Sequence, residues 1–258
     1  MFGFMIGSDV GEVGEREIES NTTARLSKSG GTYRAISQAV ELEFVPAKNF
    51  RVDVGAALAS YKINNVTGFA DARQFDLQGG EVELRYRFLD RETAPFGLAF
   101  NIGLHADRID ENTATRVRAY GTEFVLALDR ELIPDRVVAA FNLLYQPEWT
   151  SRLAVPGGAF QREATIGAAA ALMVQVQPGV FVGGETRYLR QYEGVNLGEF
   201  SGDAVFIGPT VFLKLSERSR LTAAWSFQVS GSSLEAAGHL NLVNFERHQA
   251  RLVFGVNF

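Results

Sequence analysis

Histidine is the side chain best suited to acid–base catalysis near neutral pH, and this sequence of 258 residues contains three: His105, His239 and His248. A serine becomes an effective nucleophile only beside a positioned base. Ser232 and Ser233 lie near His239 in the sequence, but only within a predicted loop, where nothing fixes these side chains relative to one another. The histidines therefore predict no active site, and we expect no catalytic residues.

Clustered carboxylates can instead hold a metal ion. Asp107, Asp110 and Glu111 fall in one predicted loop, and their oxygens suit Ca²⁺. A solvated acidic loop is the simpler interpretation, and we favour it. There is no cysteine, so disulfides and thiolate metal sites are excluded. No helix is expected after the pairs Gly79–Gly80 and Gly183–Gly184, as a phosphate-binding loop would need, so we predict bulges or bends there and no cofactor.

The remaining chemistry is a stripe of charged side chains at every second position, which suits the wall of a polar lumen. We predict that the following residues line a pore: Glu41, Glu43, Arg51, Asp53, Glu81, Glu83, Arg85, Arg87, Glu123, Glu185, Arg187, Lys214 and Arg251. Acids and bases nearly cancel, so the stripe predicts at most a modest cation preference. The charges either orient solutes, as rings of charge do in pores, or pair to rigidify a narrow wall; we favour pairing. If the first and last strands are neighbours, Arg247 and Arg251 face Glu17 and Glu19.

The elements that carry this stripe are amphipathic strands, because apolar and polar residues alternate with a period of two along nearly the whole chain. Phe50, Val52 and Val54, for example, alternate with Arg51 and Asp53. We predict twelve strands, at about 14–27, 33–45, 50–63, 75–89, 96–107, 116–129, 136–149, 159–177, 180–191, 203–215, 220–231 and 245–258. Each is long enough to cross a bilayer when tilted, which takes about 9–11 residues.

The predicted connections alternate in length. Every second one is a short turn, at 46–49, 90–95, 130–135, 178–179 and 216–219. The others are mostly longer, at 64–74, 108–115, 150–158, 192–202 and 232–244, although the first, at 28–32, is short. Short turns at one end and longer loops at the other are typical of a membrane barrel, and an even number of strands places both chain ends on the short-turn side.

Composition excludes several other classes of protein. The longest apolar run, Ile166–Val174, is far shorter than the roughly 18 residues of a membrane-spanning helix. The net charge is −5 and there is no basic block, so we expect no nucleic-acid partner. The first residues, Met1–Phe4, lack the features of a signal peptide, and we expect numbering from a mature or engineered start.

Aromatic residues fall at the ends of the predicted strands, on the apolar face. Those beside the short turns are Phe44, Phe50, Phe88, Phe96 and Phe258; those nearer the longer loops are Tyr120, Tyr145, Trp149, Tyr188 and Trp225. Rings at both levels predict the two interfacial girdles of a membrane barrel.

The final residues carry a more specific signal, an aromatic end preceded by apolar residues at every second position: Leu252, Phe254, Val256 and Phe258. This segment resembles the last strand of bacterial outer-membrane β-barrel proteins. The resemblance implies that it is the recognition signal for the barrel-insertion machinery. The opening, from Phe2 through Gly14 to Glu17, is also similar to the start of uncharacterised proteobacterial barrel proteins.

One enzyme resembles this chain in size and strand number, the twelve-strand outer-membrane phospholipase. That family needs a serine two residues after a histidine on one strand. Here the corresponding residues are Asp107, Asn241 and Ala250, so the resemblance does not extend to activity.

These observations predict an all-β protein: a single antiparallel up-and-down transmembrane β-barrel of about twelve strands at 14–258. Residues 1–13 lie outside the barrel wall, as a periplasmic segment or one that enters the lumen as a plug. We expect a bacterial outer-membrane protein in contact with lipid and lipopolysaccharide. Its leading function is passive passage of small polar solutes or ions. The alternatives are a structural or ligand-binding barrel without an open pore, a lipid-modifying enzyme, or a soluble β-sandwich or ligand-binding barrel.

Overall fold

The structure is a computed structural model that describes residues 1–153 and 160–258. Its elements are twelve strands: β1 Arg16–Leu26, β2 Thr32–Ala47, β3 Phe50–Asn64, β4 Ala72–Leu89, β5 Gly97–Ile109, β6 Arg116–Ile133, β7 Val137–Arg152, β8 Gln161–Gln177, β9 Val180–Glu193, β10 Glu199–Lys214, β11 Ser219–Ser233 and β12 His248–Asn257. No helix in the described ranges is long and apolar enough to cross a membrane.

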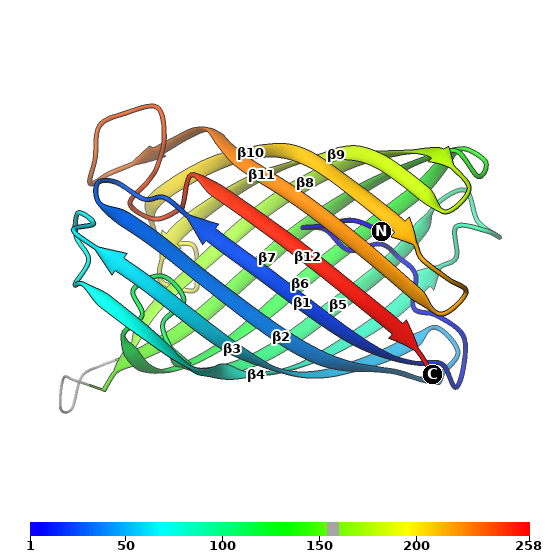
Figure 1. The fold of residues 1–258 in the computed structure, drawn as a ribbon, viewed down its shortest axis with the longest axis horizontal. Helices are drawn as coiled ribbons and strands as arrows, with labels where there is room; N and C mark the ends of the chain where they lie inside the picture. Colours follow the sequence, from blue (N-terminus) through cyan, green and yellow to red (C-terminus); the bar gives the residue numbers. More distant parts are fainter. Residues whose placement is uncertain (154–159) are drawn as a thin grey trace.

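The twelve strands form one closed barrel in which each strand pairs with the next along the chain and β12 pairs with β1 (Figure 1). Every pairing is antiparallel; at the closure Glu19 pairs with Gly255 and Thr23 with Arg251. Closure satisfies the backbone groups of the first and last strands, which an open sheet would leave exposed. The predicted fold and strand number are confirmed.

The two ends of the barrel differ. Turns at 48–49, 90–96, 134–136, 178–179 and 215–218 lie at the end that holds the C-terminus, called the short-turn end from here on. Connections at 27–31, 65–71, 110–115, 194–198 and 234–247 lie at the opposite, loop end. The predicted loop 150–158 and the predicted strand start at 159 fall partly on residues 154–159, outside the described residues. The tightest turns use Asn49 and Gly179, whose φ angles of 63° and 76° suit these residue types.

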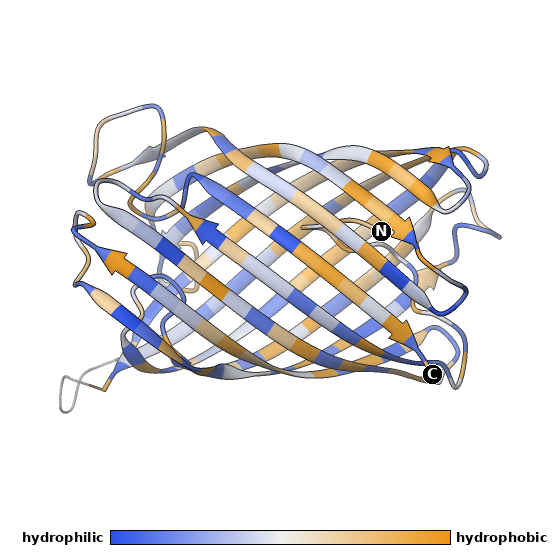
Figure 2. Ribbon diagram, viewed as in Figure 1, coloured by the Kyte–Doolittle hydropathy of each residue, from blue (hydrophilic) through white to orange (hydrophobic). Residues whose placement is uncertain are grey.

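Apolar side chains point outward from the barrel and charged ones inward. On β2, Val40 and Leu42 are 52% and 54% exposed, whereas Glu43 is 8% exposed. On β4, Val82 is exposed and Arg85 is 6% exposed. The alternation of hydrophobic and hydrophilic residues runs along the strands (Figure 2). A soluble barrel or sandwich would show the opposite distribution, with an apolar interior.

Two predictions about glycine pairs have different outcomes. The register of β3 and β4 shifts between Ala57 and Leu58, opposite Gly79 and Leu77, so a bulge lies at Gln78 beside Gly79–Gly80 as predicted. The bulge turns both Gln78 and Gly79 toward the lumen. Gly183–Gly184 pairs regularly with both neighbouring strands, and the prediction of a bulge there is wrong.

The predicted start of the last strand, at 245, is also wrong. β12 begins at His248, and Phe245 instead packs against the lumenal Phe206, with 6.2 Å between the ring centroids. Among the predicted girdle residues, Tyr120 lies at the loop end of β6, but Trp225 lies at the middle of β11. Tertiary packing decides such boundaries, and the local alternation pattern does not contain that information.

Candidate lumenal channel and its N-terminal segment

Residues 1–10 run inside the barrel as an irregular segment, which we call the lumenal segment (Figure 1). Its backbone is held by inward-facing side chains of the wall. Glu185 accepts the N–H of Phe4 at 2.8 Å, and Asn142 both accepts from Ile6 N–H and donates to its carbonyl, each at 2.9 Å. Asp129 accepts the backbone N–H of Ser8 at 2.8 Å. Charged and amide groups thus replace the backbone partners that a strand would supply.

The lumenal segment also carries its own apolar contacts. Phe2 and Met5 form a buried cluster with Val138 and Met173 on the inner face of β7 and β8. The guanidinium of Arg187 lies 4.0 Å from the centroid of the Phe4 ring, a cation–π contact. The sequence pattern predicts a polar interior, but this side of the wall is partly apolar, because it packs against the apolar side chains of the lumenal segment.

Above the lumenal segment, toward the loop end, lies a cavity of about 540 Å³, called the vestibule here. Phe4, Met5 and Ile6 line one side of it. Its carboxylates are Glu41, Glu81, Glu83, Asp107, Asp110, Glu111, Glu123, Glu148, Glu163 and Glu246. The described basic side chains on its wall are Arg25, His105, Arg187 and Arg251. Acids clearly outnumber bases on this wall, whereas acids and bases nearly balance in the predicted stripe as a whole.

Strand register explains how the vestibule collects these acids. Glu41 pairs with Gly55 and Gly55 with Glu81, so two glutamates flank a glycine at one level of the wall. Two residues along, Glu83 and Glu123 flank Gly103 in the same way.

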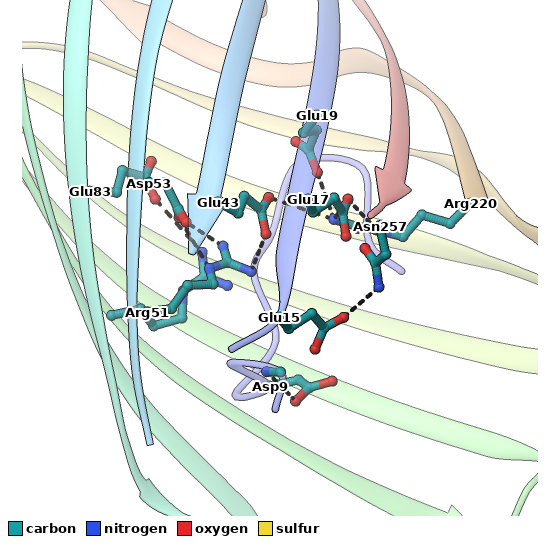
Figure 3. Close-up of polar contacts among 12 residues, drawn as sticks. Asp9, Glu15, Glu17, Glu19, Glu43, Arg51, Asp53, Glu83, Arg220 and Asn257 are labelled. Atoms are coloured by element: carbon teal, nitrogen blue, oxygen red, sulfur yellow. Dashed lines mark hydrogen bonds and ion pairs between the residues drawn. The ribbon is translucent and has the colours of Figure 1, made fainter. Parts of the chain in front are cut away.

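Nearer the short-turn end, the wall carries a network of paired charges (Figure 3). Arg51 lies 2.9 Å from both Glu43 and Asp53. Arg220 contacts Glu17 and, at 2.8 Å, Glu19. Glu17, Glu19 and Glu43 come close enough together to hold a cation, but the Arg220 guanidinium already lies within ion-pair distance of all three. This network fixes the seam between β1 and its neighbours.

The predicted partners of Glu17 and Glu19 were wrong. In the closed register Glu17 pairs with Asn257 and Glu19 with Gly255, so neither Arg247 nor Arg251 is opposite them. Arg251 Nε donates to Asn21 Oδ1 at 2.9 Å instead. The basic partner of Glu17 and Glu19 is Arg220 on β11. The alternation pattern could not predict this pair, because the register at the seam is defined only when the barrel closes.

The thirteen predicted pore-lining residues occupy different places. Those on the vestibule are Glu41, Glu81, Glu83, Glu123, Arg187 and Arg251. Those in the paired network are Glu43, Arg51, Asp53 and Arg85, the last 3.3 Å from Asn101 Oδ1. Glu185 holds the lumenal segment, Arg87 lies 3.6 Å from Asp9, and Lys214 pairs with Glu217 at the rim. Whether any of them faces a permeating solute stays a prediction.

Arg25 is not among the residues predicted to line the lumen, although the alternation along β1 places its side chain on the inner face. Its guanidinium lies 2.7 Å from Glu111 and 3.5 Å from Glu246, joining the connections 110–115 and 234–247 across the vestibule. Burial opposes ionisation of Glu111, but Arg25 outweighs it and holds the pKa of Glu111 below its ordinary value. Lys28 donates to the carbonyl of Val243 at 3.0 Å, and burial lowers the pKa of Lys28 to about 8.

The acidic residues Asp107, Asp110 and Glu111, predicted to lie in a solvated loop, line the vestibule. Asp110 accepts the backbone N–H of Thr113 at 2.7 Å, and Asp107 lies 2.7 Å from His105 Nδ1. With Glu111 paired to Arg25, all three carboxylates contact protein groups. His248 packs beside Trp225 on β11. In the described ranges, no hydrogen bond joins a serine hydroxyl to a histidine.

Several solved structures are similar to this fold. The COG4313 outer membrane channel of Pseudomonas putida F1 is similar with a TM-score of 0.64 and 12% identity, over 98% of this chain and 100% of that chain. The β domain of the Bordetella autotransporter BrkA gives a TM-score of 0.54 and 14% identity over 96% and 100%. The KdgM porin, solved with oligogalacturonate, gives 0.50 and 11% over 94% and 99%.

At these identities the likeness concerns the fold alone. Together with the apolar outer surface, it defines the class: a transmembrane β-barrel of the outer-membrane type. A family model matches residues 1–258, and the chain belongs to DUF6662, a family of unknown function. No curated protein matches the sequence.

Proposed function

We propose that this protein is a narrow passive channel for small polar solutes or ions in the bacterial outer membrane. The observation that carries the proposal is the vestibule, a polar cavity of about 540 Å³ enclosed by a barrel whose outer face is apolar. An apolar belt outside and a polar lumen inside are the requirements for carrying water and solutes across hydrocarbon. In this orientation the short-turn end faces the periplasm and the loop end faces outward.

The lumenal segment sets the width of the path. Phe4, Met5 and Ile6 form the side of the vestibule toward the periplasm, and the segment is fastened by Glu185, Asn142 and Asp129. We assign residues 1–13 to a plug that belongs functionally to the channel, while 14–258 form the barrel. Solutes must pass beside this segment or wait for it to move.

The same contacts favour one second candidate, a structural or ligand-binding barrel without an open pore. Hydrogen bonds to a buried carboxylate such as Glu185, which is 4% exposed, hold the segment firmly. Such bonds stabilise by about 1.5–3 kcal/mol each. The two candidates differ in one measurable property, which is whether ions cross.

Planar lipid bilayers containing the purified full chain test the proposal. A channel produces discrete steps of current, and a variant lacking residues 2–10 produces larger ones. If the folded full chain and the folded deletion variant both leave the bilayer silent, the channel proposal is wrong and the closed-barrel candidate stands.

The end of β12 supplies a proposal about partners. Leu252 and Phe254 point outward and are 46% and 40% exposed, and Phe258 is 65% exposed. We assign this strand to recognition by the barrel-insertion machinery, with lipid and lipopolysaccharide around the assembled protein. Phe258→Ala should then reduce assembly in cells while leaving refolding of the purified chain in detergent unchanged. Equal losses in both settings would contradict this assignment.

A further inference from the structure

The carboxylates of the lumen divide into two groups that differ in how their charge is neutralised. Near the short-turn end, Arg51 and Arg220 lie within 2.9 Å of their acidic partners. Around the vestibule, Glu41, Glu81 and Glu123 have no arginine or lysine within ion-pair distance in residues 1–153 and 160–258. Residues 154–159 contain no basic side chain. The second group therefore has more carboxyl groups than basic partners.

Backbone geometry brings two of these acids together. A Cβ added to Gly55 would lie 2.6 Å from Cγ of Glu41 and 3.3 Å from Oε1 of Glu81. Both side chains thus lie over the bare backbone of one glycine, where any larger residue would separate them. Two carboxylates that approach each other across a single intervening glycine repel when both are ionised. A mobile cation between them would relieve this repulsion.

Gln78 gives an independent indication of a cation ligand. The bulge in β4 turns its side chain toward the vestibule, where it is 6% exposed. Its Nε2 lies 3.4 Å from Glu111, but its Oε1 has no hydrogen-bond partner among the described residues. A buried amide oxygen without a donor is unusual in a folded protein, and amide oxygens bind hard cations.

The arginines on the same cavity are held by other groups. Arg187 stacks on Phe4 of the lumenal segment at 4.0 Å and donates to Gln249. Arg251 donates to Asn21 at 2.9 Å. These contacts keep both guanidiniums away from ion-pair distance of the three glutamates, so their charges only partly offset the acids.

We infer that Glu41 and Glu81, together with Glu123 and Gln78 elsewhere on the same cavity wall, bind small inorganic cations in the vestibule. The inference rests on the proposed function, and it makes the channel cation-selective. Fixed carboxylates in an enclosed polar path raise the local concentration of cations and exclude anions. Divalent cations such as Mg²⁺ interact with Glu41 and Glu81 more strongly than K⁺ does. They therefore stay bound longer and slow the passage of K⁺.

Reversal potentials across a KCl gradient test this selectivity. The test variant is Glu41→Gln/Glu81→Gln/Glu123→Gln. The matched control is Glu92→Gln/Glu217→Gln/Glu235→Gln, which removes the same formal charge from exposed positions. We expect the wild type and the control to reverse on the cation side, and the test variant to shift toward zero or to the anion side. Heat-dependent migration in gels checks that each variant is folded.

A measurement on the unaltered protein does not depend on how the variants fold. Millimolar Mg²⁺ should reduce the K⁺ current of the wild type and of the control variant. Current that is anion-selective or non-selective in the wild type, or selectivity unchanged in the folded test variant, overturns the cation site while the channel proposal survives. The absence of current from every folded form, including one lacking residues 2–10, overturns the channel proposal itself.

Discussion

Glu185 accepts the backbone N–H of Phe4 at 2.8 Å, although 181 residues separate the two in sequence. The same carboxylate accepts the N–H of Gly3 and, at 2.7 Å, the hydroxyl of Thr210. Its side chain on β9 therefore joins the lumenal segment to β10 as well. A change at Glu185 therefore reports on the segment without altering the outer face of the barrel.

Glu185→Gln should release the lumenal segment part of the time. Hydrogen bonds to a charged acceptor stabilise by about 1.5–3 kcal/mol each, and a loss of about 1.4 kcal/mol shifts the equilibrium between docked and released segment about tenfold. We expect noisier currents with more frequent large steps. Glu193→Gln, at an exposed position on the same strand, is the control. Identical recordings from the two folded variants would show that Glu185 does not hold the segment.

Arg220→Met should destabilise the seam of the barrel. The Arg220 side chain is 29% exposed and contacts Glu17, Glu19 and Glu43, each no more than 11% exposed. Removing one partner of a buried charge network costs about 3 kcal/mol. Urea unfolding in lipid vesicles measures the free energy of unfolding, with Arg218→Met in the adjacent turn as the control. If the two variants unfold at the same urea concentration, the network does not stabilise the seam.

Val82→Arg tests which face of the wall meets lipid. Val82 is outward and lies near the middle of β4, where an arginine on the lipid face costs about 2–4 kcal/mol. We expect a lower yield of folded protein in vesicles, measured by gel migration. The neighbouring inward substitution Glu83→Gln should fold normally. The reverse order of yields would mean that the wall is turned inside out.

Acid should loosen the contact between the loop end and β1. Because Arg25 holds the pKa of Glu111 below 4.5, the ionised carboxylate stabilises the connection 110–115 at pH values above 4.5. This contribution is lost as the pH falls through the lowered pKa of Glu111. The rate at which a thiol reagent labels a cysteine placed at Asn112 should then rise in acid. With Glu111→Gln added, the same cysteine should be labelled fast at every pH. If the labelling rate of the protein that keeps Glu111 does not change with pH, the assignment is contradicted.

Much of this fold is contained in local sequence pattern. The period of two, for example at Phe50–Val54, predicts the strands and their inward faces, since a residue two positions along a strand returns to the same side. The number of strands and the side on which the turns lie follow from that pattern and from punctuation such as Pro178–Gly179.

The candidate site was less predictable, because it depends on relationships between strands. The excess of acid around Glu41 and Glu81 follows from the level at which Gly55 separates them, which only register defines. The pairing of Glu17 with Arg220 follows from closure of β1 on β12. Counting charges along the chain cannot separate paired acids from unpaired ones.

The central claim is that ions cross this barrel beside its lumenal segment. Single-channel recording compares the full chain with a variant lacking residues 2–10 in the same bilayers. We predict small discrete steps from the full chain and larger ones from the deletion variant. Silent bilayers with both proteins, each shown to be folded and inserted, would contradict the claim.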